Sequence, residues 1–125
     1  MRNEIRNWWE QAKRDLTSSE NSLNSKDYYL SSFMSQQAAE KALKALVIKE
    51  KGELIKTHNL SRLAKLVNPP KDLLVKIAKL EPVYQGTRYP DATLNMPFEE
   101  FEEVDAREFL NIAKEVLEWI EKRIR

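Results

Sequence analysis

QQAAEKALKAL, residues 36–46, is the stretch that decides the fold of this chain. Its residue types, alanine, leucine, glutamine, glutamate and lysine, are strong helix formers, and no β-branched or helix-breaking residue interrupts them. Four small alanines allow neighbouring helices to approach closely, while two glutamines and three charged residues bring polar groups to the same helix. We therefore expect a tightly packed helix that carries polar side chains into or beside the core.

Apolar residues recur at helical spacing along the rest of the chain. Over about residues 26–50 they fall on more than one face, as is typical of a helix contacted from several sides. Gly52 is suited to a left-handed cap after this helix, and Thr57 or Asn59 can cap the next one. The predicted helices span about residues 3–24, 26–50, 60–67, 73–84 and 101–124, with Pro82 kinking or ending the fourth and an irregular segment over 86–97.

Helices of this length with short connections pack as an up-and-down bundle. We predict an all-α protein: an up-and-down four-helix bundle with one additional short helix between the second and fourth helices. The 125 residues suit a single domain, 1–125. The chain has 2 glycines and 5 prolines and little strand-like alternation, which agrees with a protein made of helices.

The composition argues against several classes of protein. Charged residues make up 33% of the chain but nearly balance, at a net charge of +1, so whole-chain charge does not favour strong nonspecific binding to nucleic acid. With no cysteine and one histidine, we expect no disulfide, no metal centre and no cofactor. No apolar run approaches the roughly 20 residues of a membrane span, and the first residues lack a signal-peptide core. We expect a cytoplasmic protein that does not bind membranes.

His58 is the only histidine, which limits the chemistry open to the chain. No nucleophile-elbow motif places a serine beside it, and no second histidine supports a di-iron bundle. One interpretation is structural: His58 follows Thr57 at a helix start and orders that turn by hydrogen bonding. The other is functional, because an imidazole near a helix N-terminus can help to hold an anion.

Arg88-Tyr89-Pro90-Asp91 lies in the irregular segment, where Pro90 restricts Tyr89 to an extended backbone. Arginine is the best side chain for gripping a phosphate, and tyrosine can stack on a base. In the alternative interpretation, Arg88 pairs with Asp91 or Glu40 and Tyr89 packs over the end of the bundle.

Gln37, Glu40, Lys41 and Lys44 follow the i, i+3, i+4, i+7 spacing of one helical stripe. If this stripe faces the segment over 86–97, it forms a polar pocket at one end of the bundle. If it faces solvent, it is a salt-bridged surface.

Trp8 and Trp9 are neighbours in the first helix, so their side chains point about 100° apart. Trp8 lies on the apolar stripe, and we expect it to pack in the core. One of the two covers the edge of another helix or a subunit interface.

Three segments resemble the signature of the HEPN family, a small helical domain of nucleotide-associated proteins in archaea and bacteria. They are residues 36–46, Lys56-Thr57-His58-Asn59-Leu60 and Arg88-Tyr89-Pro90-Asp91, in the family's order. The resemblance implies a helical bundle, a homodimer and a ligand that is a nucleotide or RNA. It also implies a separate minimal nucleotidyltransferase as partner, in some cases within a toxin–antitoxin pair. The candidate ligand-binding residues are Arg88, Tyr89, His58, Gln37, Glu40, Lys41, Lys44 and Asp91.

Catalytic HEPN ribonucleases carry an arginine, four to six further residues and then a histidine near the start of the last long helix. RNA cleavage through the 2′-hydroxyl needs such a pair, a proton-transfer group and a cation for the phosphate. Neither Arg88 nor Arg107 is followed by a histidine at that distance. We therefore assign no catalytic residue and favour a protein that is not an enzyme.

The sequence favours a non-catalytic HEPN accessory protein that binds nucleotide or RNA. Two alternatives stay open: a ribonuclease toxin with a degenerate site, and a purely structural homodimeric interaction module.

Overall fold

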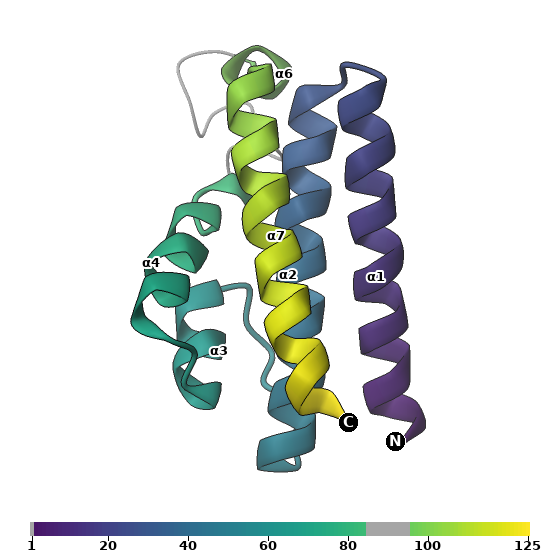
Figure 1. Ribbon diagram of the computed structural model, residues 1–125, viewed down its shortest axis with the longest axis vertical. Coiled ribbons are helices and arrows are strands. Elements are labelled where there is room, and N and C mark those ends of the chain that lie inside the picture. Colours follow the sequence, from purple (N-terminus) through teal and green to yellow (C-terminus); the bar gives the residue numbers. More distant parts are fainter. Residues whose placement is uncertain (1, 85–95) are drawn as a thin grey trace.

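The computed structural model describes residues 2–84 and 96–125, and this part of the chain is made of helices without strands (Figure 1). The predicted all-α class is thus confirmed. Three of the helices in this part are long and three are short. Their bounds are α1 Asn3–Asn24, α2 Tyr28–Lys51, α3 Leu60–Val67, α4 Lys71–Leu80, α6 Pro97–Glu100 and α7 Glu103–Ile124.

Helix α2 is the centre of the molecule. It packs against α1, α7 and α3 and touches α6 (Figure 1). Of its 24 residues, 14 are buried, and alanines 38, 39, 42 and 45 are fully enclosed. A helix buried on several sides does not show a single apolar stripe. The alanine-rich stretch therefore provides the close approach that its composition predicts.

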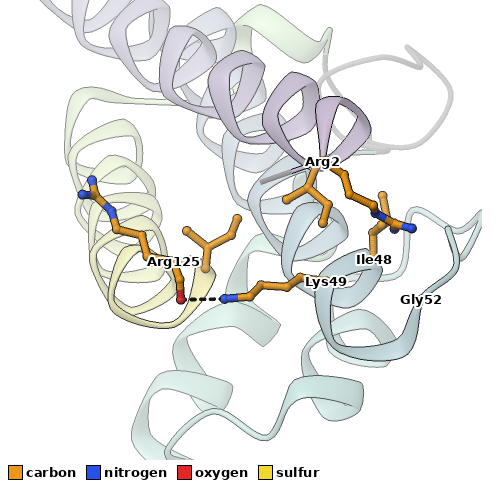
Figure 2. Close-up of a pocket in the computed structure, with 7 residues that line it drawn as sticks. Arg2, Ile48, Lys49, Gly52 and Arg125 are labelled. Atoms are coloured by element: carbon orange, nitrogen blue, oxygen red, sulfur yellow. Dashed lines mark hydrogen bonds between the residues drawn. The ribbon is translucent and has the colours of Figure 1, made fainter.

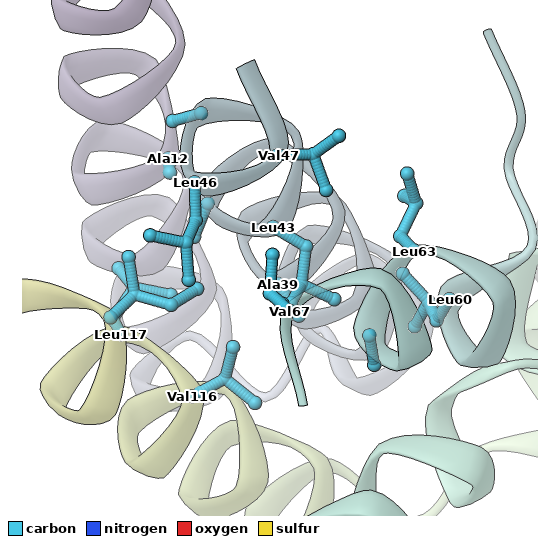
Figure 3. Close-up of a cluster of buried hydrophobic side chains, with 14 of the residues drawn as sticks. Ala12, Ala39, Leu43, Leu46, Val47, Leu60, Leu63, Val67, Val116 and Leu117 are labelled. Carbon is cyan, nitrogen blue, oxygen red and sulfur yellow. The ribbon is translucent and has the colours of Figure 1, made fainter. Parts of the chain in front are cut away.

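The core fills the space between α2 and its neighbours (Figure 3). Leu46 packs in the region of Ala12 from α1 and Leu117 from α7, whereas Leu43 lies toward α3. Each fully buried leucine contributes about 1.5–3 kcal/mol relative to exposure. The side chains that α3 adds to this core are Leu60, Leu63, Ala64 and Val67.

Three buried serines join α1 to α2 near the turn between them. The Ser19 hydroxyl lies 2.7 Å from that of Ser35 and 3.1 Å from that of Ser31, and it donates to the Ser31 carbonyl oxygen at 2.8 Å. The Ser31 hydroxyl in turn donates to the Ser19 carbonyl oxygen at 2.9 Å. Because these small hydroxyl groups satisfy one another, the two helices approach closely without leaving these buried oxygens unpaired.

The ends of the helices follow the local sequence. Gly52 adopts a left-handed conformation, with φ of 83°, directly after α2, as its position predicts. Asn59 caps α3 by accepting a hydrogen bond from the Arg62 amide at 2.9 Å. Helix α4 ends at Leu80, two residues before Pro82, so it has 10 residues and is much shorter than α1, α2 and α7.

The tryptophan pair agrees with the prediction in part. Trp8 packs against the core but stays half-buried, whereas its neighbour Trp9 is the more enclosed, at 4% exposure. The buried face of α1 includes Asp15 and Ser19 as well as Ile5 and Ala12. The apolar pattern alone does not reveal these two polar members of the core-facing stripe.

Within the helices that the structure describes, none is long and apolar enough to cross a membrane.

The close packing around α2 predicts the effect of adding bulk there. Ala42→Leu should lower the free energy of unfolding by about 1–3 kcal/mol, because a fully enclosed position has no room for three more carbon atoms. The measurement is urea denaturation followed by circular dichroism. The matched control is Ala78→Leu on the exposed side of α4, for which a change within about 0.5 kcal/mol is expected. Equal effects of the two substitutions would contradict the packing described for α2.

Candidate functional site

A buried carboxylate, Glu40, organises the polar groups of α2. Glu40 is 3% exposed, and Gln36 and Lys44 lie one helical turn before and after it on the same stripe. The Gln36 amide nitrogen donates to Glu40 Oε1 at 3.0 Å, and Lys44 Nζ donates to Oε2 at 3.0 Å. Lys44 is itself only 7% exposed. This is a buried ion pair with an additional hydrogen bond, an arrangement that holds both charges rigidly.

His58 approaches the same carboxylate from the connection between α2 and α3. Its Nδ1 lies 3.0 Å from Oε2 and 3.2 Å from Oε1 of Glu40. A carboxylate paired with a lysine only accepts hydrogen bonds, so Nδ1 carries the proton and donates it. The His58 side chain is nevertheless 58% exposed. Glu40 therefore fixes the imidazole while its Nε2 remains available for contact with another molecule.

Two aromatic rings complete the cluster. The imidazole of His58 stacks on the ring of Tyr84, with centroids 4.4 Å apart and planes inclined by 18°. The ammonium group of Lys44 lies 5.2 Å from the centroid of a Trp8 ring, within the range of a cation–π contact. Residues from α1, α2, the α2–α3 connection and the chain after α4 thus meet around Glu40. We call Trp8, Gln36, Glu40, Lys44, His58 and Tyr84 the Glu40 cluster.

Lys41 belongs to a separate network. Its Nζ lies 2.5 Å from Oδ2 of Asp15, a buried residue of α1, and the Gln11 amide donates to Oδ1 of the same carboxylate at 2.8 Å. Lys41 therefore ties α2 to α1 rather than joining Glu40 and Lys44. The amide oxygen of Gln37 is buried without a hydrogen-bond partner among the described residues, as is that of Gln36.

The structure thus divides the predicted polar stripe. Glu40, Lys44 and His58 come together, whereas Lys41 and Gln37 do not join them. Glu40 and Lys44 lie toward the middle of α2, not at its end. Arg88, Tyr89 and Asp91 fall outside the described residues.

Three participants were absent from the sequence-based list: Gln36, Tyr84 and Trp8. Gln36 stands four residues before Glu40, and this spacing predicts that the two side chains meet on one face of the helix. The role of Tyr84 had no such signal, because 26 sequence positions separate it from His58 and only the fold stacks the two rings. Within residues 2–84 and 96–125, no group of three or more potential metal-ligating residues is present.

The family model for the HEPN domain matches residues 5–123, so the chain belongs to the HEPN family. Two solved structures resemble it over nearly their whole length. TT1696 from Thermus thermophilus has 33% sequence identity and a TM-score of 0.90, covering 97% of this chain and 98% of that one. ST0689, described as an archaeal HEPN homologue, has 36% identity and a TM-score of 0.84, covering 100% of both chains. None of the curated proteins compared matches the chain.

The buried ion pair between Glu40 and Lys44 is expected to contribute to stability. Glu40→Gln keeps the shape of the side chain but leaves Lys44 buried without its counter-charge, so unfolding should become easier by about 3 kcal/mol. Chemical denaturation at neutral pH measures the loss. Adding Lys44→Met should restore part of it, because the unpaired charge is then gone. Glu115→Gln removes the partner of the half-exposed Lys76 and serves as the control, with an expected cost below about 1 kcal/mol. If Glu40→Gln destabilises the protein no more than Glu115→Gln does, the buried ion pair between Glu40 and Lys44 is refuted.

Proposed function

We propose that this HEPN protein binds a nucleotide or the phosphate groups of RNA beside His58, without catalysing a reaction itself, and acts with a separate nucleotidyltransferase. The observation that carries the proposal is the exposed imidazole of His58, anchored by Glu40 and stacked on Tyr84. An imidazole whose Nδ1 is held by a buried carboxylate presents Nε2 in one direction. When the imidazole is protonated, its Nε2 can donate a charged hydrogen bond to a phosphate oxygen.

The surroundings of His58 suit a ligand with both a charged and an aromatic part. The His58–Tyr84 stack offers aromatic surface for a base, which adds about 1–3 kcal/mol per stacked base in comparable sites. Arg88 follows Tyr84 by four residues in the sequence. Because of this short separation in the sequence, we keep Arg88, Tyr89 and Asp91 as candidates for contact with a phosphate or a base.

Binding is favoured over catalysis by what the chain lacks. The arginine and histidine pair of HEPN ribonucleases is missing from the sequence, and the only histidine has its Nδ1 engaged by Glu40. Cleavage through the 2′-hydroxyl needs groups that both accept and donate a proton at the reacting atoms. The nucleotidyltransferase partner, within a toxin–antitoxin pair or otherwise, is proposed from the family resemblance alone.

Calorimetric titration with AMP, ATP and a short single-stranded RNA tests the proposal. At least one of them should bind, and His58→Ala and Arg88→Ala should each weaken binding about tenfold or more, because each removes a charged hydrogen bond. Arg62→Ala, on the exposed side of α3, is the matched control and should change the affinity by less than about twofold.

The same samples separate the alternatives. RNA cleavage that disappears in His58→Ala would favour the ribonuclease over the binding protein. If neither nucleotides nor RNA bind, the structural interaction module becomes the better account of the chain.

Exposed apolar side chains suggest where a homodimer forms. Met96 and Phe98, at the start of α6, are 47% and 61% exposed, and Val104 in the first turn of α7 is 69% exposed. Large apolar side chains grouped on a surface are typical of protein interfaces. We include a homodimer through this surface in the proposed function.

Sedimentation velocity over a range of concentrations tests the dimer. Phe98→Glu should raise the dimer dissociation constant about tenfold or more, since it places a charge where an aromatic side chain is buried by the partner. Val75→Glu, on α4, is an equally drastic change at a position 63% exposed and should leave association unchanged. Association that responds to Val75→Glu but not to Phe98→Glu would place the interface elsewhere.

A further inference from the structure

A pocket of about 680 Å³ lies where α1 begins and where α2 and α7 end (Figure 2). This volume falls within the roughly 300–1,000 Å³ of pockets that hold small molecules in proteins. The function proposed above does not use it, since its lining shares no residue with the Glu40 cluster. The residues that line it are Arg2, Ile5, Ile48, Lys49, Gly52, Ile124 and Arg125.

The floor of the pocket is apolar and comes from three helices. Ile5, Ile48 and Ile124 belong to α1, α2 and α7, and each is almost fully buried, at 5%, 1% and 2% exposure. Gly52 turns the chain away from the end of α2 and has no side chain to cover the opening. A Cβ atom placed on it would have no atom within 4 Å, so this wall faces open space.

The rim of the pocket is positively charged. Arg2 and Lys49 line it with their side chains, and among the described residues no acidic side chain lines the pocket. Arg125 also lines it, but its side chain points away from Arg2, Lys49 and Ile48 (Figure 2). Lys49 is held in place, because its Nζ donates to the main-chain oxygens of Arg123 at 2.7 Å and Arg125 at 2.8 Å. Figure 2 marks the bond to Arg125. An ammonium group has three protons, so one remains for a ligand.

Arg2 keeps its donors free as well, since it makes no ion pair within the described part of the chain. The Arg125 guanidinium group pairs with Glu121 at 3.1 Å and does not take part in this rim. Arg2 and Lys49 thus place positive charge beside a surface that favours hydrocarbon.

We propose that this pocket binds a small amphiphilic anion: a molecule with an aliphatic body and one carboxylate or phosphate group. The body would cover Ile5, Ile48 and Ile124, and the head group would contact Arg2 and Lys49. The described lining contains no aromatic side chain, so it offers no stacking surface for a base. This separates it chemically from the His58 surface, where the ligand is proposed to stack.

Calorimetric titration with alkyl carboxylates tests both halves of the proposal. Hexanoate, octanoate and decanoate, kept below their micelle concentrations, should bind with an affinity that rises up to about fourfold per added methylene group, as burial of hydrocarbon requires. Decyl phosphate should bind as well if the cations recognise the negative charge, and its affinity relative to decanoate identifies the preferred head group. Decyltrimethylammonium has the same body with the opposite charge and should not bind.

Charge reversal on the rim locates the site. Arg2→Glu should weaken decanoate binding about tenfold or more, because it removes one cation and adds an anion beside the head group. Arg14→Glu makes the same change at an exposed position of α1 that does not line the pocket, and it should alter the affinity by less than about twofold. Circular dichroism shows that both variants are folded.

Three results would overturn the proposal. They are the absence of binding by decanoate and decyl phosphate at millimolar concentration, equal weakening by Arg2→Glu and Arg14→Glu, and binding of decyltrimethylammonium as tight as that of decanoate. Titration of AMP into the Arg2→Glu variant tests whether the His58 surface and the pocket are separate sites. Unchanged AMP affinity with lost decanoate binding supports a second site, whereas parallel loss of both ligands would mean that only one site exists.

Discussion

Burial of α2 on several sides is the constraint on which the rest of the structure depends. A helix surrounded by α1, α7 and α3 has to be narrow, and its four alanines make it so. The charged side chains that it carries into or beside the core also need partners within the protein, because an unpaired buried charge is costly. Glu40 is bound by Lys44, Gln36 and His58. Lys41 pairs with Asp15 of α1.

The same constraint gives the Glu40 cluster its character. A carboxylate on an exposed helix would pair with lysine only weakly and would leave a neighbouring imidazole free to rotate. Glu40 is enclosed, so it holds Lys44 and His58 in fixed positions while the His58 ring stays exposed against Tyr84. Presentation of His58 therefore depends on the burial of Glu40 in the packed centre of the molecule.

The two surfaces proposed for ligands differ in what surrounds their charges. Around His58, aromatic rings accompany the polar groups, which suits a base and a phosphate. At the junction of α1, α2 and α7, the cationic side chains of Arg2 and Lys49 lie beside isoleucines, which suits an aliphatic anion. Both lie on a family fold shared with ST0689, the archaeal HEPN homologue, and the fold alone does not decide which ligand either surface takes.

The sequence by itself determined the helices α1, α2, α3, α4 and α7, the cap at Gly52, the central place of residues 36–46 and the HEPN family, because these follow from local propensity, periodicity and short sequence motifs. It also pointed to Glu40, Lys44 and His58 as polar residues of interest. It did not predict the short helix α6. Only the tertiary structure decided that Lys41 pairs with Asp15, that Trp9 rather than Trp8 is buried, and that His58 stacks on Tyr84. These outcomes depend on how far each helix is rotated about its axis and on contacts between distant segments. Buried polar residues set that rotation together with the apolar ones, and a pattern of apolar residues does not reveal it.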